Sequence, residues 1–243
     1  MKYEFIYKTI FFPEKGILAV GDLHLGFEKM LEEAGISPPE KQVSGIISDL
    51  KKVFNELIKR KHNLKKIVFL GDIKHFFTKE SKEKDELKEI VDFLKKNIDE
   101  KNIIFIKGNH DIQKNLGGIT PKTYHIEEDV IFTHGHQQIL ETSDKKIKII
   151  VFGHLHPSLM LKEKSSEKIE FYKCFLEGKY NGKIFLVVPS FMRVIEGTLI
   201  NNYEEDYIES FSIIPKKDIM NSRVYIVGEN KAYEFGRINE LLS

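Results

Sequence analysis

Cysteine is nearly absent from this chain, which has a single one, Cys174, among 243 residues. One cysteine excludes an intrachain disulfide, so no covalent cross-link stabilises the fold. The shortage also fits a reducing compartment. We therefore expect a cytoplasmic protein in which Cys174 is a packing residue.

Long apolar runs are missing from the amino terminus. The segment MKYEFIYKTIFF interrupts its apolar residues with charged ones every few positions. A signal peptide needs an uninterrupted apolar stretch, and a membrane-spanning helix needs a longer one. The sequence therefore predicts neither at this end, and we expect no membrane partner.

An excess of charge of one sign is lacking too. The 38 Lys and Arg residues balance 37 Asp and Glu residues, which leaves a net charge of +1. This excludes the strong positive field that marks many nucleic-acid-binding domains, but it leaves the partner open. Hydrophobic residues make up 41% of the chain, which is enough at this length to bury one large core. We expect a single domain over residues 1–243.

Short apolar runs of strand length, by contrast, are frequent. They cover residues 17–20, 67–70, 103–106, 130–132, 147–152 and 184–188, and they predict buried strands. Between the first two runs, residues 43–58 repeat apolar side chains at helical spacing, and Ser37, Pro38 and Glu40 predict a capping box for this helix. A second amphipathic helix is predicted over 81–97. Strands that alternate with helices indicate a layered α/β fold.

The second half of the chain is predicted to be rich in strands. After Val130 the apolar runs are separated by hairpin turns at Asn181-Gly182 and Gly228-Glu229-Asn230 instead of long helices. Residues 162–168 read as an exposed polar connection. The sequence shows no internal repeat and no strong domain boundary.

Polar motifs directly follow five of the apolar runs. Seven of the nine histidines lie in these motifs. The motifs are Gly21-Asp22-Leu23-His24, Gly71-Asp72-Ile73-Lys74-His75, Gly108-Asn109-His110-Asp111, Thr133-His134-Gly135-His136 and Gly153-His154-Leu155-His156. In layered α/β proteins the carboxyl ends of the strands open onto one crevice, so we expect these residues to converge.

The residue types in the motifs are those of a metal site. Carboxylates, imidazoles and the neutral amide oxygen of an asparagine form a mixed oxygen and nitrogen shell suited to manganese, iron or zinc. Asp22 with His24, and His154 with His156, are spaced to act as chelating pairs. Asp72 stands alone between these pairs, so it is the candidate to bridge two ions. A lone motif of this kind also fits a hydrogen-bonded turn, and the prediction rests on all five motifs together.

The five motifs resemble those of the calcineurin-like metallophosphoesterase superfamily over residues 18–157. The resemblance implies a calcineurin-like β-sandwich flanked by helices. It also implies a centre of two divalent ions, with manganese as the first expectation and iron, zinc or nickel as alternatives. One ion would be held by Asp22, His24, Asp72 and His156, and the other by Asp72, Asn109, His134 and His154.

Two neighbouring residues are predicted to act in catalysis, the first of them from the resemblance. His110 matches the catalytic histidine of the superfamily, and it would stabilise the transition state or protonate the departing oxygen. Asp111 is predicted to orient the ring of His110 as a hydrogen-bond acceptor. The two metals would activate a water for in-line attack on phosphorus, so no protein nucleophile is required.

A nuclease branch of the superfamily, the SbcD type, is similar to this chain in further places. Where many members carry a carboxylate this chain has His75, and the run Asp22-Leu23-His24-Leu25-Gly26 also matches. In its size and in the segment Pro189-Ser190-Phe191, this chain resembles the small SbcD-related archaeal phosphoesterases. Their bacterial relatives include the ligase-associated DNA-repair phosphodiesterase. The resemblance implies that His75 helps to place a nucleic-acid strand. At this length we expect no separate DNA-binding cap domain.

Three functions follow from the resemblance. The first is a manganese-dependent phosphodiesterase or nuclease that acts on DNA or RNA, with a role in DNA repair. The alternative is a phosphomonoesterase or a small-molecule phosphodiesterase, because the metals select phosphate and the surrounding loops select the rest of the substrate. The third is a non-catalytic subunit that docks a helicase or ligase, which the complete ligand set disfavours. A helicase or ligase also remains a candidate partner of the enzyme.

For two residues near the motifs, the sequence leaves two roles open. His136 is equally compatible with a partner of the metal ligands and with a solvent-facing turn. Arg193, just after the Pro-Ser-Phe segment, could clamp a phosphate, although an ordinary surface salt bridge is the more frequent role of such a residue.

Overall fold

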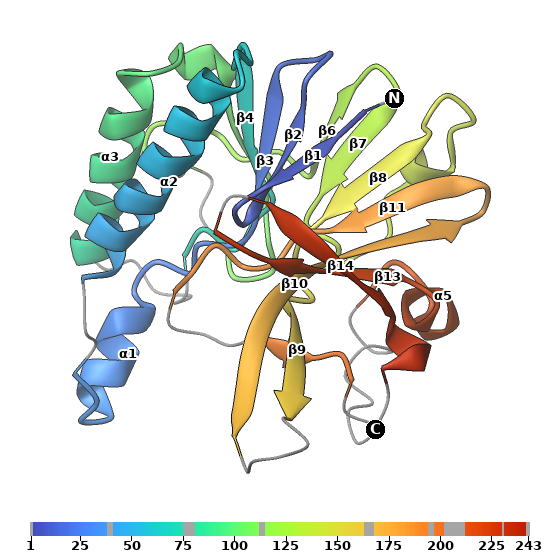
Figure 1. Ribbon diagram of the computed structural model, residues 1–243. Helices are drawn as coiled ribbons and strands as arrows, with labels where there is room; N and C mark the ends of the chain where they lie inside the picture. Colours follow the sequence, from blue (N-terminus) through green and yellow to red (C-terminus); the bar gives the residue numbers. More distant parts are fainter. Residues whose placement is uncertain are drawn as a thin grey trace.

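The computed structural model describes most of the chain in two packed β-sheets flanked by helices (Figure 1). The described residues are 2–37, 41–74, 81–111, 115–162, 168–193, 197–201, 212–229 and 231–241, with side chains omitted for 81–84. The predictions for Pro38, Glu40 and His75 lie outside these residues. No described helix has the length and apolar character needed to cross a membrane.

The first sheet has the strand order β1-β2-β3-β4-β5. Its strands are β1 (Glu4–Ile6), β2 (Thr9–Phe12), β3 (Ile17–Val20), β4 (Lys66–Phe69) and β5 (Ile103–Phe105). The first three strands are antiparallel neighbours, whereas β3, β4 and β5 run parallel. The carboxyl ends of these three strands therefore meet at one edge of the sheet.

Helices cover the outer face of this sheet. The long connections between its parallel strands contain α1 (Phe27–Glu33), α2 (Gln42–Lys59), α3 (Ser81–Lys95) and the short η1 (Glu100–Asn102). Leu18, Val20 and Phe69 alternate with inward-facing residues and pack on one core cluster with α2 and α3. Figure 1 shows α2 and α3 side by side along this face, with α1 below their lower ends.

The second sheet has the strand order β12-β9-β10-β11-β8-β7-β6, and β13 joins β10 to β14. Its strands are β6 (Tyr124–Glu127), β7 (Val130–Thr133), β8 (Ile149–Phe152), β9 (Pro157–Lys162), β10 (Ile169–Tyr180), β11 (Lys183–Val187), β12 (Thr198–Leu199), β13 (Arg223–Val227) and β14 (Ala232–Arg237). The central strands β7, β8 and β11 are parallel. The short helices η2 (Leu140–Ser143), α5 (Lys216–Met220) and η3 (Ile238–Glu240) complete this half.

The two sheets pack on a shared apolar core. Val68 and Ile104 of the first sheet lie in one cluster with Phe132, Val151 and other residues of the second. The rings of Phe12 and Phe132 meet edge to face at 5.7 Å. The predicted helix-flanked β-sandwich is therefore confirmed.

Most predicted elements agree with the structure, and the differences concern the start of α2 and several strands. The predicted runs lie in β3, β4, β5, β7, β8 and β11, and the Asn181-Gly182 turn joins β10 to β11 with both residues at positive φ (49° and 76°). The start of α2 was predicted too early, because its N-cap is Lys41 and carries no side-chain cap. Strands β1 and β2 were not predicted, because the charges in this segment hide their pattern.

Candidate metal centre

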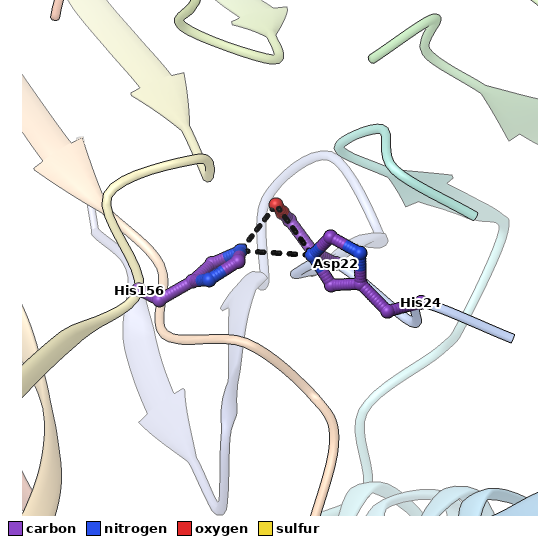
Figure 2. A group of neighbouring side chains, drawn as sticks. All are labelled: Asp22, His24 and His156. Atoms are coloured by element: carbon purple, nitrogen blue, oxygen red, sulfur yellow. Dashed lines mark hydrogen bonds and ion pairs between the residues drawn. The ribbon is translucent and has the colours of Figure 1, made fainter. Parts of the chain in front are cut away.

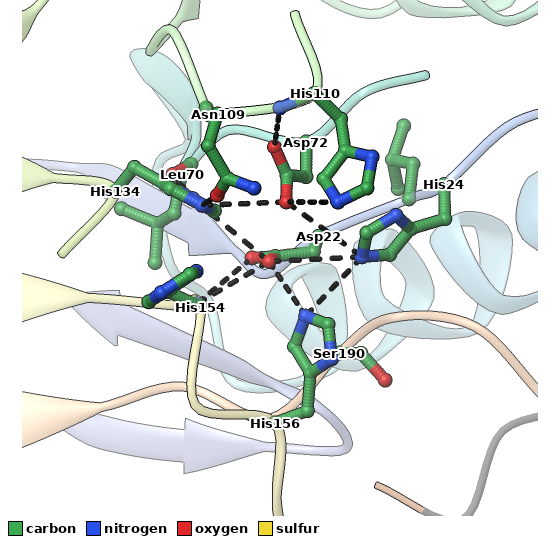
Figure 3. Close-up of polar contacts among 12 residues, drawn as sticks. Asp22, His24, Leu70, Asp72, Asn109, His110, His134, His154, His156 and Ser190 are labelled. Atoms are coloured by element: carbon green, nitrogen blue, oxygen red, sulfur yellow. Dashed lines mark hydrogen bonds and ion pairs between the residues drawn. The ribbon is translucent and has the colours of Figure 1, made fainter. Parts of the chain in front are cut away.

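The candidate metal ligands follow the carboxyl ends of five parallel strands, drawn from both sheets. Asp22 and His24 come after β3, and Asp72 and Asn109 come after β4 and β5. From the second sheet, His134 follows β7, and His154 and His156 follow β8. The strands end at a common edge of the sandwich, so these side chains converge (Figure 3).

Asp22, His24 and His156 form a first cluster. One ligand atom from each lies within 4.8 Å of the other two. His156 Nε2 is 2.6 Å from Asp22 Oδ2 and 3.3 Å from His24 Nε2 (Figure 2). Asp22 is fully buried, whereas His156 is partly exposed.

A second cluster contains Asp72, His134 and His154, whose ligand atoms also lie within 4.8 Å of one another. Asn109 belongs beside them, since its Oδ1 lies 3.0 Å from His134 Nε2. The other ring nitrogen of His134, Nδ1, lies 2.9 Å from the carbonyl oxygen of Leu70. This hydrogen bond directs Nε2 of His134 toward Asp72 and Asn109.

Asp72 lies between the two clusters. Its Oδ2 is 3.4 Å from Nε2 of His134 and 4.0 Å from Nε2 of His24. The structure thus brings together all seven residues that the sequence predicted as ligands, with Asp22, His24 and His156 in one cluster and Asp72, His134 and His154 in the other, next to Asn109. A carboxylate between two ligand clusters could bridge two ions, and this role of Asp72 stays a prediction.

The donor set and its spacing fit two divalent ions. Metal–ligand distances of about 2.0–2.2 Å place neighbouring ligand atoms a few ångströms apart, as they are in both clusters. Two carboxylates, four imidazoles and one amide oxygen suit manganese, iron, zinc or nickel, since no thiolate is present among them. When bound, such ions polarise a phosphate oxygen and activate water.

Unusual backbone conformations support the clusters. His24, Asp72, His154 and His156 all have positive φ, between 44° and 63°, a region that residues with a side chain seldom adopt. Such conformations concentrate at functional sites, where the surrounding structure holds them. The site therefore has a backbone that local preference alone would not form.

Two glycines let the backbone approach the carboxylates. A Cβ added to Gly108 would lie 2.0 Å from Oδ1 of Asp72, and one on Gly153 would lie 2.2 Å from Oδ1 of Asp22. Neither distance is compatible with a side chain. Glycine in these motifs is therefore needed for close packing against the ligands.

The electrostatics of the site favour charged carboxylates. Burial raises the pKa of Asp72, but its hydrogen bond with His134 and the nearby histidine charges hold that pKa well below its usual range. Burial also opposes ionisation of Asp22, and His156 and His134 outweigh it and lower the pKa of Asp22. Both carboxylates are therefore available as ligands at neutral pH.

The histidines of the site fall into two groups. Burial lowers the pKa of His24 to about 3 and that of His154 to about 4, so both are neutral and ready to ligate. Burial acts on His134 in the same direction, but the charges of Asp22 and Asp72 outweigh it and raise the pKa of His134 to about 9. Coordination through His134 therefore requires the release of a proton.

His110 lies at the exposed side of the clusters. Its backbone N–H donates to Oδ1 of Asp72 at 2.9 Å, and its Nε2 is 4.0 Å from Oδ2 of Asp72. The side chain retains 26% of its exposure, whereas Asp22, Asp72 and His134 are almost fully buried. The ring is therefore placed to reach a phosphate that enters from solvent.

Asp111 is buried and makes a different set of contacts. Its carboxylate accepts backbone N–H groups of Ile73, Lys74 and Gly108 at 3.0–3.2 Å. These hydrogen bonds hold the loop that follows Asp72. The predicted role of Asp111 toward the ring of His110 stays a prediction.

The structure shows what surrounds His136 and Arg193, the two residues for which the sequence leaves two roles open. The ring of His136 lies 5.1 Å from that of His134 and 6.1 Å from that of His154, and burial lowers the pKa of His136 to about 4. Arg193 donates to both carboxylate oxygens of Asp49 at 2.6 and 3.1 Å. These contacts favour a neighbour of the ligands for His136 and a salt bridge for Arg193.

A loop that supports Asp22 has no signal in the sequence. Phe191 N–H donates to the carbonyl oxygen of Asp22 at 2.9 Å. The ammonium group of Lys173, on β10, donates to three acceptors: the carbonyl oxygen and the hydroxyl of Ser190, and the carbonyl oxygen of Met192. Lys8 donates to the carbonyl oxygen of Phe191 at 2.7 Å. A buried lysine in a strand resembles a surface lysine in sequence, so these contacts could not be predicted.

Comparison with known proteins identifies the family. A family model of calcineurin-like phosphoesterases matches residues 16–173, which is more than half of the chain. The chain belongs to this family. It is a metal-dependent phosphoric ester hydrolase, and the family uses a binuclear metal centre, in agreement with the two clusters.

Solved structures add information on the fold. A nuclease MPE from Pseudomonas putida is 19% identical with a TM-score of 0.56, and the match covers 93% of this chain and 92% of that protein. A metallophosphoesterase from Sphaerobacter thermophilus is 11% identical with a TM-score of 0.31, over 91% of this chain and 88% of that one. No curated protein matches this chain. The first comparison confirms the fold of this calcineurin-like phosphoesterase.

Proposed function

We propose that this phosphoesterase is a phosphodiesterase that cleaves nucleic-acid strands, with manganese as its metal. The observation that carries the proposal is the shared position of Asp72 between two ligand clusters, with the exposed ring of His110 beside it. Such a centre supports hydrolysis of a phosphate ester without a protein nucleophile. The ring of His110 would stabilise the transition state or protonate the leaving oxygen.

The choice of nucleic acid as substrate rests on two supports. The motif Gly71-Asp72-Ile73-Lys74-His75 resembles the SbcD-type nucleases, and a fold neighbour in Pseudomonas putida is named a nuclease. We extend the proposal to a cytoplasmic role in DNA repair, with a helicase or ligase as a candidate partner. A near-neutral charge of +1 favours the alternative of a phosphomonoesterase or small-nucleotide phosphodiesterase, so the assay must separate the two.

A substrate panel tests the proposal. With added Mn²⁺, we expect hydrolysis of bis-p-nitrophenyl phosphate and cleavage of labelled single-stranded or duplex oligonucleotides, and little hydrolysis of p-nitrophenyl phosphate. The His75→Ala variant should keep its metals and the small-diester activity but lose most oligonucleotide cleavage, because a small diester has little strand to position. Preference for the monoester would reject the nuclease assignment.

A further inference from the structure

The hairpin formed by β9 and β10 extends outward from the metal clusters. β9 begins at Pro157, directly after His156, and its residues 158–162 pair with residues 173–169 of β10. With a strand rise of about 3.4 Å per residue, the Met160–Phe171 pair lies ~7 Å beyond the Ser158–Lys173 pair, and the Lys162–Ile169 pair lies ~14 Å beyond it. Figure 1 shows the outer ends of both strands projecting from the body of the molecule.

One face of this hairpin is covered by the protein. Leu159, Leu161 and Tyr172 point to this side and pack on the core cluster that also contains Ile200 and Ile213. These residues are accounted for by packing. Because side chains alternate along a strand, the other face of the hairpin points away from this core cluster.

The other face carries Met160, Lys162, Ile169 and Phe171, which we call the open face. Further along β10 on the same side, Phe175 lies in the core between the sheets and stacks on Phe5 at 4.4 Å. The open face is therefore the outward continuation of the surface on which the two sheets meet.

Lys173 joins the open face to the metal centre. It lies on the same side of β10 as Phe171, and its Nζ donates to the Ser190 hydroxyl at 2.7 Å. The next residue of that loop, Phe191, donates to the carbonyl oxygen of Asp22. A ligand bound at the clusters would therefore have the open face next to it.

The composition of the open face is unusual for a free surface. Phe171 retains 39% of its exposure and Ile169 retains 47%, and Lys162 beside them is exposed. Among the described residues of this face there is no carboxylate, since Glu170 points to the opposite side and pairs with Lys168. An exposed ring with a nearby cation matches the surfaces on which single-stranded nucleic acids stack their bases.

We infer that the open face binds unpaired nucleobases of the strand whose scissile phosphate lies at the metal clusters, with one base stacked on Phe171. The inference rests on the proposed function and adds to it a preference for single-stranded substrate next to the cleaved bond. Stacking tolerates any base, because each base has a π-face. The preference should therefore concern strandedness and not sequence.

Substitutions at Phe171 test the inference through kcat/KM with Mn²⁺. The substrates are a single-stranded thymidine oligonucleotide and an abasic oligonucleotide of the same length. For Phe171→Leu we expect a loss on the order of tenfold on the thymidine strand and a much smaller loss on the abasic one. Phe171→Tyr should retain the thymidine rate, because its ring still stacks. Phe235→Leu on β14 is the matched control, since Phe235 has a similar exposure of 40%, and it should behave like the wild type.

Several outcomes would overturn the inference. Equal losses on both oligonucleotides would show that Phe171 only supports the fold, and no loss would show that no base rests on it. If the wild type hydrolyses bis-p-nitrophenyl phosphate but neither oligonucleotide, the proposed function fails and this inference fails with it. Oligonucleotide cleavage with an unchanged Phe171→Leu variant rejects the inference alone.

Discussion

At the scale of single residues, His110 differs from the ligands around it. Asp22, His24, Asp72 and His134 are buried, whereas His110 retains 26% of its side-chain exposure and contacts Asp72 through its backbone N–H. A residue in this position can act on the substrate without holding a metal. Its substitution should therefore separate metal binding from chemistry.

We predict that His110→Ala keeps both metals and loses catalytic rate. The expected loss in kcat is about 100- to 1,000-fold, the scale for removal of one transition-state donor. Metal content by mass spectrometry and steady-state kinetics provide the measurement, with His24→Ala as the comparison that should lose metal. Loss of metal from His110→Ala would reassign His110 as a ligand.

A second residue-scale feature is the ion pair of Asp49 with Lys8 and Arg193. Lys8 Nζ is 2.8 Å from Asp49 Oδ2, and the Asp49 side chain is 13% exposed. Burial raises the pKa of Asp49, but the contacts of Arg193 and Lys8 outweigh it and lower the pKa from 3.8 to about 2. A folded-state pKa below the unfolded one means that the pair stabilises the protein above pH 3.8 and loses this effect as the pH falls toward 2.

We expect Asp49→Asn to destabilise the protein by about 2 kcal/mol at pH 7, since one pKa unit corresponds to about 1.4 kcal/mol. The difference between variant and wild type should shrink as the pH falls through the range from 3.8 to about 2. Urea unfolding at several pH values measures it. A difference that stays constant down to the lowest pH would contradict the role of the Asp49 charge.

At the scale of elements, β10 links the core to the metal centre. This strand lies in the second sheet along its length, and its Lys173 hydrogen-bonds the loop of Ser190 and Met192. That loop in turn hydrogen-bonds the backbone at Asp22. Hydrogen bonds thus connect one strand of the sheet, through this loop, to the backbone of Asp22 in the first cluster.

We predict that Lys173→Ala lowers both metal affinity and activity. The substitution leaves three acceptors on the loop without their donor, with a cost of about 1–3 kcal/mol in stability for such groups. Lys183→Ala is the matched control, because Lys183 also donates to two backbone carbonyl oxygens, those of Asp144 and Ile147, outside the site. Metal titration should separate the variants, and equal metal affinity in both would show that Lys173 has only a structural role.

The sequence predicted the elements that build the site better than those that support it. The strands before the motifs are buried on both faces, so they appear as uninterrupted apolar runs, as in β4 and β8. The strands β9, β10 and β14 are partly exposed, and their mixed composition hides them. The positive φ of Asp72 and the contacts of Lys173 depend on distant segments, so no local pattern encodes them.

At the scale of the whole molecule, neither sheet contains a complete metal site. The first cluster takes Asp22 and His24 from one sheet and His156 from the other, and the second cluster combines Asp72 with His134 and His154 in the same way. Asp72 of the second cluster also lies 4.0 Å from His24 of the first. Metal binding should therefore stabilise the packing of the two sheets, because binding to the folded state alone raises its stability.

The most direct test of this account is the metal content of Asp72→Asn beside that of the wild type. The wild type should hold two divalent ions per chain. The variant should lose occupancy of both and lose activity with it, because a neutral amide cannot replace a shared carboxylate. Asp99→Asn, at a side chain 74% exposed, serves as the control and should keep both ions. Two ions per chain with near-normal turnover in Asp72→Asn would contradict the central claim that Asp72 joins the two metal sites.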